Sequence, residues 1–301
     1  MPPTKKYPRF VAALLVYTLI VILWGAWVRI SHSGDGCGAS WPLCQGQVLP
    51  QAMTAPTWIE FGHRLSSGLY GFLVLGLVLL SFRWYPRGHT LRKISLLTFF
   101  FTMSEALLGA GLVLRGLVGA NESAARAWVM VLHMTNSLLL MGSLAACYFS
   151  STFECRVAQG IPGKQRWISL VLLASFLIIT ATGALAALSG TLFPSDSLLE
   201  GLVKDLTSQS HFLLRLRIWH PITAVLIGGA VVMFSWAVAR TNQQMNARAR
   251  TLMGTLLFGM AFGVMTLLSL SPTWMKLGHL AMAHLIWVQL VLFTLGLWAS
   301  E

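Results

Sequence analysis

Residues 10–29 read FVAALLVYTLIVILWGAWVR, a run whose single charge stands at its last position. An α-helix of about 20 apolar residues is long enough to cross the hydrocarbon core of a bilayer. Lipid cannot satisfy open backbone groups, so a spanning segment of this kind has to be helical. Seven further runs of similar character follow, at 62–82, 94–114, 128–149, 168–188, 214–238, 251–270 and 279–299. The sequence therefore predicts an all-α polytopic membrane protein with eight transmembrane helices.

Composition supports this fold class and orients the chain. The 301 residues are 56% hydrophobic and only 10% charged, whereas soluble domains carry about 25% charged residues. Thirteen of the 21 Lys and Arg lie at the N-terminus and in the connections near 83–93, 156–166 and 240–250. These segments alternate with connections that hold most of the acids, which is the positive-inside pattern. We expect a bacterial inner membrane, both termini in the cytoplasm, and no nucleic-acid partner despite the net charge of +12.

The beginning of the chain is interpreted as a membrane span. Lys5, Lys6 and Arg9 precede the first apolar run, and no small-residue cleavage site closes it. We therefore expect a first spanning helix with its N-terminus inside, rather than a cleaved signal peptide.

Loop lengths indicate an internal repeat. The outer connections 30–61 and 189–213 are long, whereas 115–127 and 271–278 are short. This alternation predicts two pseudo-symmetric four-helix bundles, residues 1–150 and 151–301, joined by the cytoplasmic stretch 150–167. Both halves would run in the same direction, which makes the repeat parallel rather than inverted.

Four histidines lie at matched depths in this repeat. Each stands near the outer end of an even-numbered span, and alternate helices of an up-down bundle face each other diagonally. The four are His63, His133, His220 and His279. Facing imidazoles can hold an iron porphyrin from both sides, so the pattern predicts one heme site in each half. For any one of them, an interhelical hydrogen bond or a proton relay is the alternative.

Charged residues near the same depth add detail to this hypothesis. Arg64 follows His63, and Arg217 precedes His220 by three residues, so either could meet a heme propionate. The alternative for such cations is snorkelling to the headgroups. Glu60 stands one helical turn before His63, where it could handle a proton or a water, or simply stabilise the helix N-terminus.

Other polar residues stay without an assigned role. Glu105 lies in the middle of the third span and is expected to face the bundle interior. The sequence assigns no role to Glu105 or to His211, which lies in an outer loop. His284, five residues after His279, is an alternative ligand that ranks behind His279. Cys37 and Cys44 share the first outer loop, where a disulfide or a reversible dithiol is available on the oxidising side. A zinc site there lacks a fourth ligand.

Several segments together resemble the heme A synthase family. They are RISHSGDGCGASWPLCQGQ, IEFGHRLSSG, LLGAGLVLRGLVG, ARAWVMVLHMTNSLLL, RLRIWHPITAVL and LGHLAMAHLIW, and they cover nearly all of the chain. The combination of a cysteine-containing loop with E-x-x-H-R is the specific part. The resemblance implies a membrane oxidoreductase that converts the C8 methyl of heme O to the formyl of heme A, for terminal oxidase assembly.

The resemblance also separates the two histidine pairs. It implies that His63 and His133 hold the substrate heme O, beside Glu60 as the functional glutamate. It implies that His220 and His279 hold a permanent heme b that carries electrons. Cys37 and Cys44 match loop cysteines linked to redox chemistry or heme transfer. Some relatives carry a second cysteine pair, which 189–213 lacks.

Two other functions remain open from the residues alone. A di-heme b-type electron carrier would keep both hemes permanently, but such carriers commonly place two histidines on each helix. A heme-free transporter with parallel repeats would use the histidines as relays. Because heme O is the substrate that the resemblance implies, we expect a heme O synthase (protoheme farnesyltransferase) and an electron donor as partners.

Overall fold

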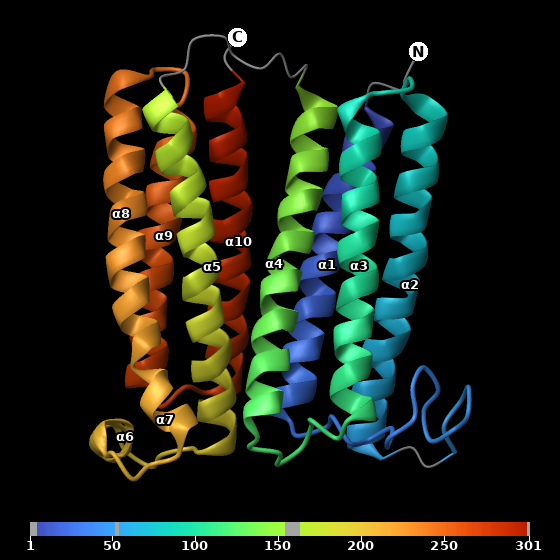
Figure 1. Cartoon of the computed structure of the whole chain (residues 1–301), viewed down its shortest axis with the longest axis vertical. Helices are drawn as coiled ribbons and strands as arrows, with labels where there is room; N and C mark the ends of the chain where they lie inside the picture. The colour runs from blue at the N-terminus through green and yellow to red at the C-terminus, as the bar shows by residue number, and fades with distance from the viewer. Residues whose placement is uncertain (1–4, 52–53, 154–162, 300–301) are drawn as a thin grey trace. The chain divides into compact units, whose positions relative to one another are not determined.

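The computed structural model describes residues 5–51, 54–153 and 163–299. Within these ranges the chain is helical and contains no β-strand (Figure 1). In the described ranges eight helical segments are long and apolar enough to cross a membrane, which confirms the predicted all-α, multi-pass fold class. The helices are α1 (Lys6–Ile30), α2 (Ala55–Trp84), α3 (Thr90–Leu114), α4 (Ala124–Thr152), α5 (Gly163–Leu192), α6 (Leu198–Leu206), α7 (Phe212–Arg217), α8 (Trp219–Thr241), α9 (Asn246–Leu268) and α10 (Thr273–Trp298).

The chain divides into two compact units, Met1–Thr152 and Phe153–Glu301. In the first unit, α2 and α4 each pack against both α1 and α3, so the four helices form a ring in which α2 lies diagonally opposite α4. In the second unit, α8 and α10 each pack against both α5 and α9, and the diagonal pair is therefore α8 and α10. Each unit is thus an up-down-up-down bundle with the same order of neighbours.

Helix starts follow ordinary capping chemistry. Thr54 precedes α2, and its hydroxyl accepts a hydrogen bond from the Thr57 backbone N–H. Such a cap satisfies one of the amides that a helix start leaves open. At the other end of α2, Pro86 follows Tyr85, and a proline cannot continue the helix. These ends fix where the second span meets its two loops.

Two features of the second unit go beyond the sequence prediction. The connection 189–213 contains a short amphipathic helix, α6, which Ser197 caps by accepting from the Glu200 N–H. The sixth span is divided at Ile218 into α7 and α8. Pro221 stands in the first turn of α8, where its missing N–H costs no helical hydrogen bond. The break places His220 in the first turn of a new helix.

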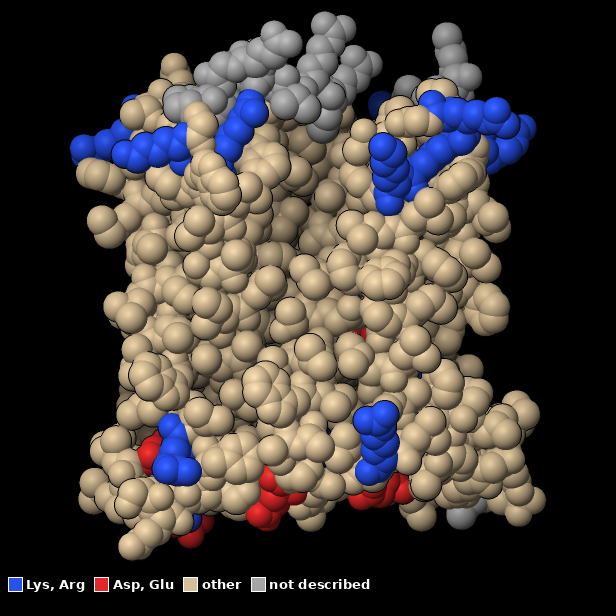
Figure 2. All heavy atoms as spheres, in the orientation of Figure 1, with Lys and Arg blue, Asp and Glu red and all other residues tan. Residues whose placement is uncertain are grey.

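Charge divides the two ends of each bundle. On the face shown in Figure 2, Lys and Arg of the first unit gather at the end where α1 begins and α4 ends, and most of its acidic side chains lie at the opposite end, where α2 and α4 begin. In the second unit the basic end is the end where α5 begins and α10 ends, and the acidic end is the end where α8 and α10 begin. In each unit the surface between the ends is almost free of charge, as a lipid-facing surface requires.

The tightest packing of the first unit lies toward its basic end. A buried cluster joins the first half of α1 to the second halves of α2 and α4, and it includes Leu14, Val74, Leu77 and Leu144, all at most 1% exposed. His63 and His133 occupy the other half of the same bundle. Close packing of this cluster therefore helps to hold the bundle together at the end away from the two histidines.

Candidate functional site

His63 and His133 lie on the diagonal helices of the first unit, as the sequence predicted for an up-down bundle. His63 is on α2 and His133 on α4, and both side chains are partly buried. His63 lies within electrostatic range of both His133 and Glu105. The Nδ1 atom of His133 is 3.2 Å from a carboxylate oxygen of Glu105 on α3. The two imidazoles and one carboxylate therefore share the same level of this bundle.

His220 and His279 form the corresponding pair in the second unit. Their ring centres are 6.2 Å apart, and the ring planes are inclined at 75°. A metal–imidazole bond is about 2 Å long, so rings on opposite sides of one metal ion have centres on the order of 6 Å apart. The separation therefore fits two axial ligands of a single heme iron, and the residues present suit that group.

Each of the four histidines packs against a glycine on a neighbouring helix. A Cβ atom built on Gly25, Gly183 or Gly263 would lie 2.9, 3.0 or 2.7 Å from the Cε1 atom of the facing imidazole, and one on Gly109 would lie 3.8 Å away. The pairs are Gly25–His63, Gly109–His133, Gly183–His220 and Gly263–His279. At Gly25 and Gly263 a methyl group would force the imidazole to shift, and at Gly183 it would make a tight contact to which the ring would have to yield slightly. We call the four glycines the glycine seats.

The ring nitrogens are oriented alike at all four positions. Nδ1 is buried in each imidazole and makes no well-aligned hydrogen bond among the described residues. Nε2 is therefore the nitrogen that is available to a ligand. In metal-binding histidines the surroundings of one ring nitrogen commonly fix the orientation of the ring, and the other nitrogen binds the metal. Two of the rings still have a polar group close by, since His133 Nδ1 is 3.2 Å from Glu105 and the His220 ring lies within hydrogen-bonding range of the Ile179 backbone. The same ring orientation at all four positions favours a ligand-binding role over a purely structural one.

Glu60 and Arg64 hold the first outer loop onto the start of α2. Glu60 is 3% exposed, and its Oε2 accepts a hydrogen bond of 2.8 Å from the Cys37 backbone N–H. Its other oxygen accepts from the Arg64 guanidinium. Arg64 also donates to the carbonyls of Ser40 and Leu43. Both residues predicted for catalysis or propionate binding are thus engaged with the loop in this structure.

A disulfide closes the same loop. Cys37 and Cys44 are bonded to each other, which agrees with the sequence prediction that a disulfide is available there. Gly36, beside Cys37, lies so close to α2 that a Cβ atom there would be 2.4 Å from the Pro56 backbone. The Gly36 carbonyl also accepts from the Thr57 hydroxyl at 2.9 Å. The loop is therefore fixed on top of the helix that carries His63.

The predicted propionate ligand Arg217 has a protein partner. Its guanidinium pairs with Asp205 at 2.7 Å and donates to the Gly201 carbonyl of α6, so it ties α6 to α7. Sequence reasoning missed Arg126, which is 4% exposed at the acidic end of the first unit. Its Nη1 donates to the carbonyls of Gly119 and Asn121, and its Nε atom has no hydrogen-bond partner among the described residues.

Arg126 is a second candidate for an anionic group. It lies within electrostatic range of Arg29 on α1. Asp35 also lies within electrostatic range of Arg126 and supplies one negative charge there. A heme propionate in the first unit would be a second anion suited to this pair of guanidiniums. The sequence did not identify Arg126 as a candidate, because a cation near the end of a span is common at a membrane interface.

The remaining histidines have local roles. His284 is fully buried, and its Nδ1 lies 2.9 Å from the Leu280 carbonyl one turn earlier on the same helix. His211 caps α7 by accepting from the Leu213 N–H, and its ring packs on Phe193 and Phe212. In the described part of the chain no three His, Cys, Asp or Glu side chains gather as a metal cluster. The histidine pairs are the candidate iron ligands.

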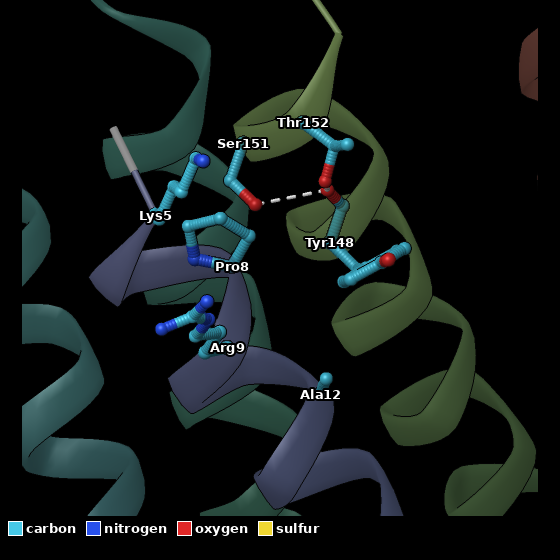
Figure 3. Close-up of a pocket in the computed structure, with 7 residues that line it drawn as sticks. All are labelled: Lys5, Pro8, Arg9, Ala12, Tyr148, Ser151 and Thr152. Atoms are coloured by element: carbon cyan, nitrogen blue, oxygen red, sulfur yellow. Dashed lines mark hydrogen bonds between the residues drawn. The ribbon is translucent and has the colours of Figure 1, made fainter. Parts of the chain in front are cut away.

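A surface pocket lies well away from these histidines. Figure 3 shows it between the first turns of α1 and the last turns of α4, lined by Lys5, Arg9, Tyr148, Ser151 and Thr152, among others. Ser151 and Thr152 both donate to the Tyr148 carbonyl, so their hydroxyls are already bonded. Lys5 and Gly25 are separated by most of the length of α1, on the order of 30 Å. The pocket belongs to the basic end.

The fold and the histidine pairs define a helical membrane protein with one diagonal bis-histidine pair in each four-helix unit. The chain matches the model of the COX15-CtaA family, described as cytochrome oxidase assembly protein, over residues 8–291. It belongs to this family. The resemblance found in the sequence motifs is therefore confirmed.

Individual relatives cover the chain to different extents. The chain is 37% identical over 295 residues to a Thermus thermophilus protein named Protoheme IX farnesyltransferase, over 96% of this chain and 48% of that protein. It is 39% identical over 140 residues to proteins named Heme A synthase from Bacillus cereus and Bacillus anthracis, over 45% of this chain and 42% of each relative. The chain spans about half the length of the curated relatives it matches.

Proposed function

We propose that this protein is a heme A synthase, a membrane oxidoreductase that oxidises the C8 methyl of heme O to the formyl of heme A. The observation that carries the proposal is the pair of diagonal bis-histidine sites, one in each bundle, with ring centres 6.2 Å apart in the second. Membership of a cytochrome oxidase assembly family supports it. So does the name Heme A synthase carried by the Bacillus relatives.

The two sites differ in their surroundings, and this difference supports the division of roles. The first unit places a buried carboxylate, a disulfide loop and Glu105 around or above His63 and His133. We assign the substrate heme O to this site. In the second unit Ile179 and Gly259 stand where the first unit has Glu105, so we assign the permanent heme b there. A bound heme b would carry electrons between an outside donor and the site in the first unit.

The reaction replaces two methyl hydrogens by one oxygen. It removes four electrons from the substrate by one of two paths. In the first, two successive hydroxylations each consume one O2, two protons and two electrons from a donor, and the product then loses water. In the second, four electrons pass to an external acceptor, four protons are released, and one water supplies the oxygen. In either path His63 and His133 hold the porphyrin, and the loop above them limits access of water. Glu60 is the acid nearest the start of α2 and the residue placed to handle a proton, provided that it exchanges its Cys37 or Arg64 partner.

Localisation and partners are proposals of the same kind. The basic end of each bundle supports a topology with both termini in the cytoplasm and the histidines near the outer face of a bacterial inner membrane. The Thermus relative is about twice as long and is named for farnesyl transfer to protoheme IX. We propose that a heme O synthase supplies the substrate to this chain, as a separate protein or a fused one.

Expression in a host that makes no heme A tests the activity. The chain is co-expressed with a heme O–making farnesyltransferase, and the extracted porphyrins are separated and identified by mass. Heme A is expected, with or without the hydroxylated intermediate. The farnesyltransferase alone serves as the control and is expected to give heme O only. If both cultures give only heme O, although the chain is present in the membrane, the proposal is wrong.

Replacing Glu60 by glutamine is expected to lower the ratio of heme A to heme O by about 100-fold or more, because the change removes the carboxylate that handles the proton. The matched control is Glu200→Gln, which removes an exposed carboxylate paired with Lys204 on α6. Thiol labelling of Cys37 and Cys44 shows whether the loop stays closed. If the ratio of heme A to heme O is unchanged and the disulfide is intact, Glu60 has only a structural role in holding the loop.

Replacing Gly263 by alanine is expected to lower the heme content of the second unit at least tenfold, because the new methyl would lie 2.7 Å from the His279 ring and displace it. Gly254 lies on the same helix, and a Cβ atom there meets nothing within 4 Å. Gly254→Ala is therefore the control and should retain heme. Heme per polypeptide, measured from the absorbance of the purified protein, compares them. Equal heme content in both variants would contradict the glycine seat.

A further inference from the structure

Glu105 is a carboxylate in the middle of α3 that the proposed reaction does not use. Three side chains of α4 surround it. Asn136 Nδ2 donates to Oε2 at 2.6 Å, the Ser137 hydroxyl donates to Oε1, and His133 Nδ1 lies 3.2 Å from that same Oε1. The carboxylate is thus held between an amide, a hydroxyl and an imidazole.

The amide that holds Glu105 is itself fixed. Asn136 is 8% exposed, donates to the Phe101 carbonyl at 2.9 Å and accepts from the Ser104 hydroxyl at 2.7 Å. Every atom of this network comes from α3 or α4, which pack against each other. A carboxylate has about four acceptor positions, so two donors leave room for a third. The network therefore holds the acceptor oxygen Oε1 of Glu105 close to Nδ1 of His133.

The second unit lacks this network at the equivalent positions. Glu105 stands four residues before the seat Gly109, and the residue four before Gly263 is Gly259. A Cβ atom on Gly259 would lie 2.7 Å from the Ile286 side chain, so aliphatic packing fills this place. Asn136 and Ser137, three and four residues after His133, correspond to Met282 and Ala283 after His279.

The other two seats also lack a carboxylate at this position. The residues four before Gly25 and Gly183 are Val21 and Ile179. Among the four histidine–glycine pairs, which all lie in the described part of the chain, His133 is therefore the one with an acid one turn before its seat. The repeat makes this a difference between otherwise matched sites rather than a general feature of the bundle.

We propose that Glu105 is a positioning residue of the first site, which accepts a hydrogen bond from His133 Nδ1–H and so directs Nε2 at the iron of the bound heme. The inference rests on the proposed function of that site. In the structure the ring N–H is not aligned with Oε1, and a small rotation of the imidazole on ligation of Nε2 completes the bond. Carboxylate–histidine–metal arrangements of this kind fix the ring and make it a stronger electron donor.

A stronger donor stabilises the oxidised iron, and this gives the inference an electrochemical consequence. The heme of the first site has a lower reduction potential than it would have without Glu105. In the second unit Ile179 and Gly259 stand at the positions that correspond to Glu105, so the heme of the second site should be independent of Glu105. Changes at Glu105 and Ser137 should therefore move one of two potentials, in directions that can be worked out beforehand.

The test is a redox titration of the purified full chain, loaded anaerobically with heme O and followed by absorbance. The signal of the first site is identified as the one missing in His63→Ala. In Glu105→Gln, which keeps the shape and removes the charge, the first potential should rise and the second should stay. In Ser137→Ala the carboxylate loses a competing donor, so the first potential should fall. Glu200→Gln is the control and should move neither.

The outcomes separate the inference from the proposed function. If the wild-type first site takes up no heme, the proposed function fails before Glu105 is tested. If it takes up heme and the first potential is unchanged in both Glu105→Gln and Ser137→Ala, the positioning role is overturned. Opposite shifts of the first potential alone support it. Should Glu105→Gln fail to fold, the direction of the shift in Ser137→Ala decides.

Discussion

Replacing His63 by alanine is expected to abolish the conversion of heme O to heme A, by roughly 100-fold or more, since even outer-shell partners of a metal ligand contribute 10–100-fold. The change removes the His63 imidazole and its contact with Gly25. Of the two proposed ligands of the substrate heme iron, only His133 would remain. The heme of the second unit should remain. Heme A in the extracted porphyrins and the absorbance of the purified protein measure the two effects.

A second histidine of the same unit is the matched control. His89 lies at the basic end, where its Nδ1 caps α3 by accepting from the Leu91 N–H at 3.2 Å. His89→Ser keeps a capping oxygen and should leave heme A production unchanged. Continued heme A production in His63→Ala would refute the assignment of the substrate site, whatever the control shows.

Replacing His279 by alanine is expected to remove the heme of the second unit, whereas replacing His284 by leucine should leave it in place. The reason is geometric. His279 faces His220 with ring centres 6.2 Å apart, while the His284 ring lies against the Leu280 carbonyl of its own helix. The amplitude of the reduced-minus-oxidised spectrum, per polypeptide, measures the loss.

The same pair of variants settles which histidine of α10 is the ligand. Heme A production should fall in His279→Ala together with the spectrum, because electrons no longer pass through the second unit. If His284→Leu loses the heme of the second unit and His279→Ala keeps it, then His284 and not His279 is the ligand on α10. Folding is checked by the detergent-solubilised yield of both proteins.

The spans and the helices that carry the histidines could be predicted because both depend on local pattern. Apolar length identifies a membrane helix whatever it packs against. The histidine pairs followed from two general rules, that a chain crosses the membrane alternately and that alternate helices of an up-down bundle are diagonal. The division at Ile218 was not predicted, because Pro221 in a first turn is compatible with a continuous span as well.

The glycine seats show what a single sequence does not reveal. Glycine is common in membrane helices, and many of the 27 glycines here face open space, Gly254 among them. Only the packing of neighbouring helices shows which of them meets an imidazole. A signal did exist, since Gly25 and Gly263 each stand near the outer end of an odd-numbered span, at the depth of a histidine on the next helix. This match in depth could have been used to predict the contacts between these glycines and the histidines.

The charged residues were harder to interpret than the histidines. Glu60, Arg64 and Arg217 were placed at the correct ends of their helices, but their partners lie in loops whose folding is set by distant contacts. Glu105 was expected to face the bundle interior, and its partners on α4 show why it can do so. Helical spacing finds the face of a residue, whereas its partner depends on the neighbouring helix.

The most direct test of the account counts heme at each site. The wild-type protein and two double variants, His63→Ala/His133→Ala and His220→Ala/His279→Ala, are purified and saturated with heme O and heme b, and bound heme is determined per polypeptide. The account predicts two hemes in the wild type and one in each double variant, with the remaining heme showing a different spectrum in the two cases. Loss of both hemes from a folded double variant, or of neither, would contradict two separate histidine-held sites.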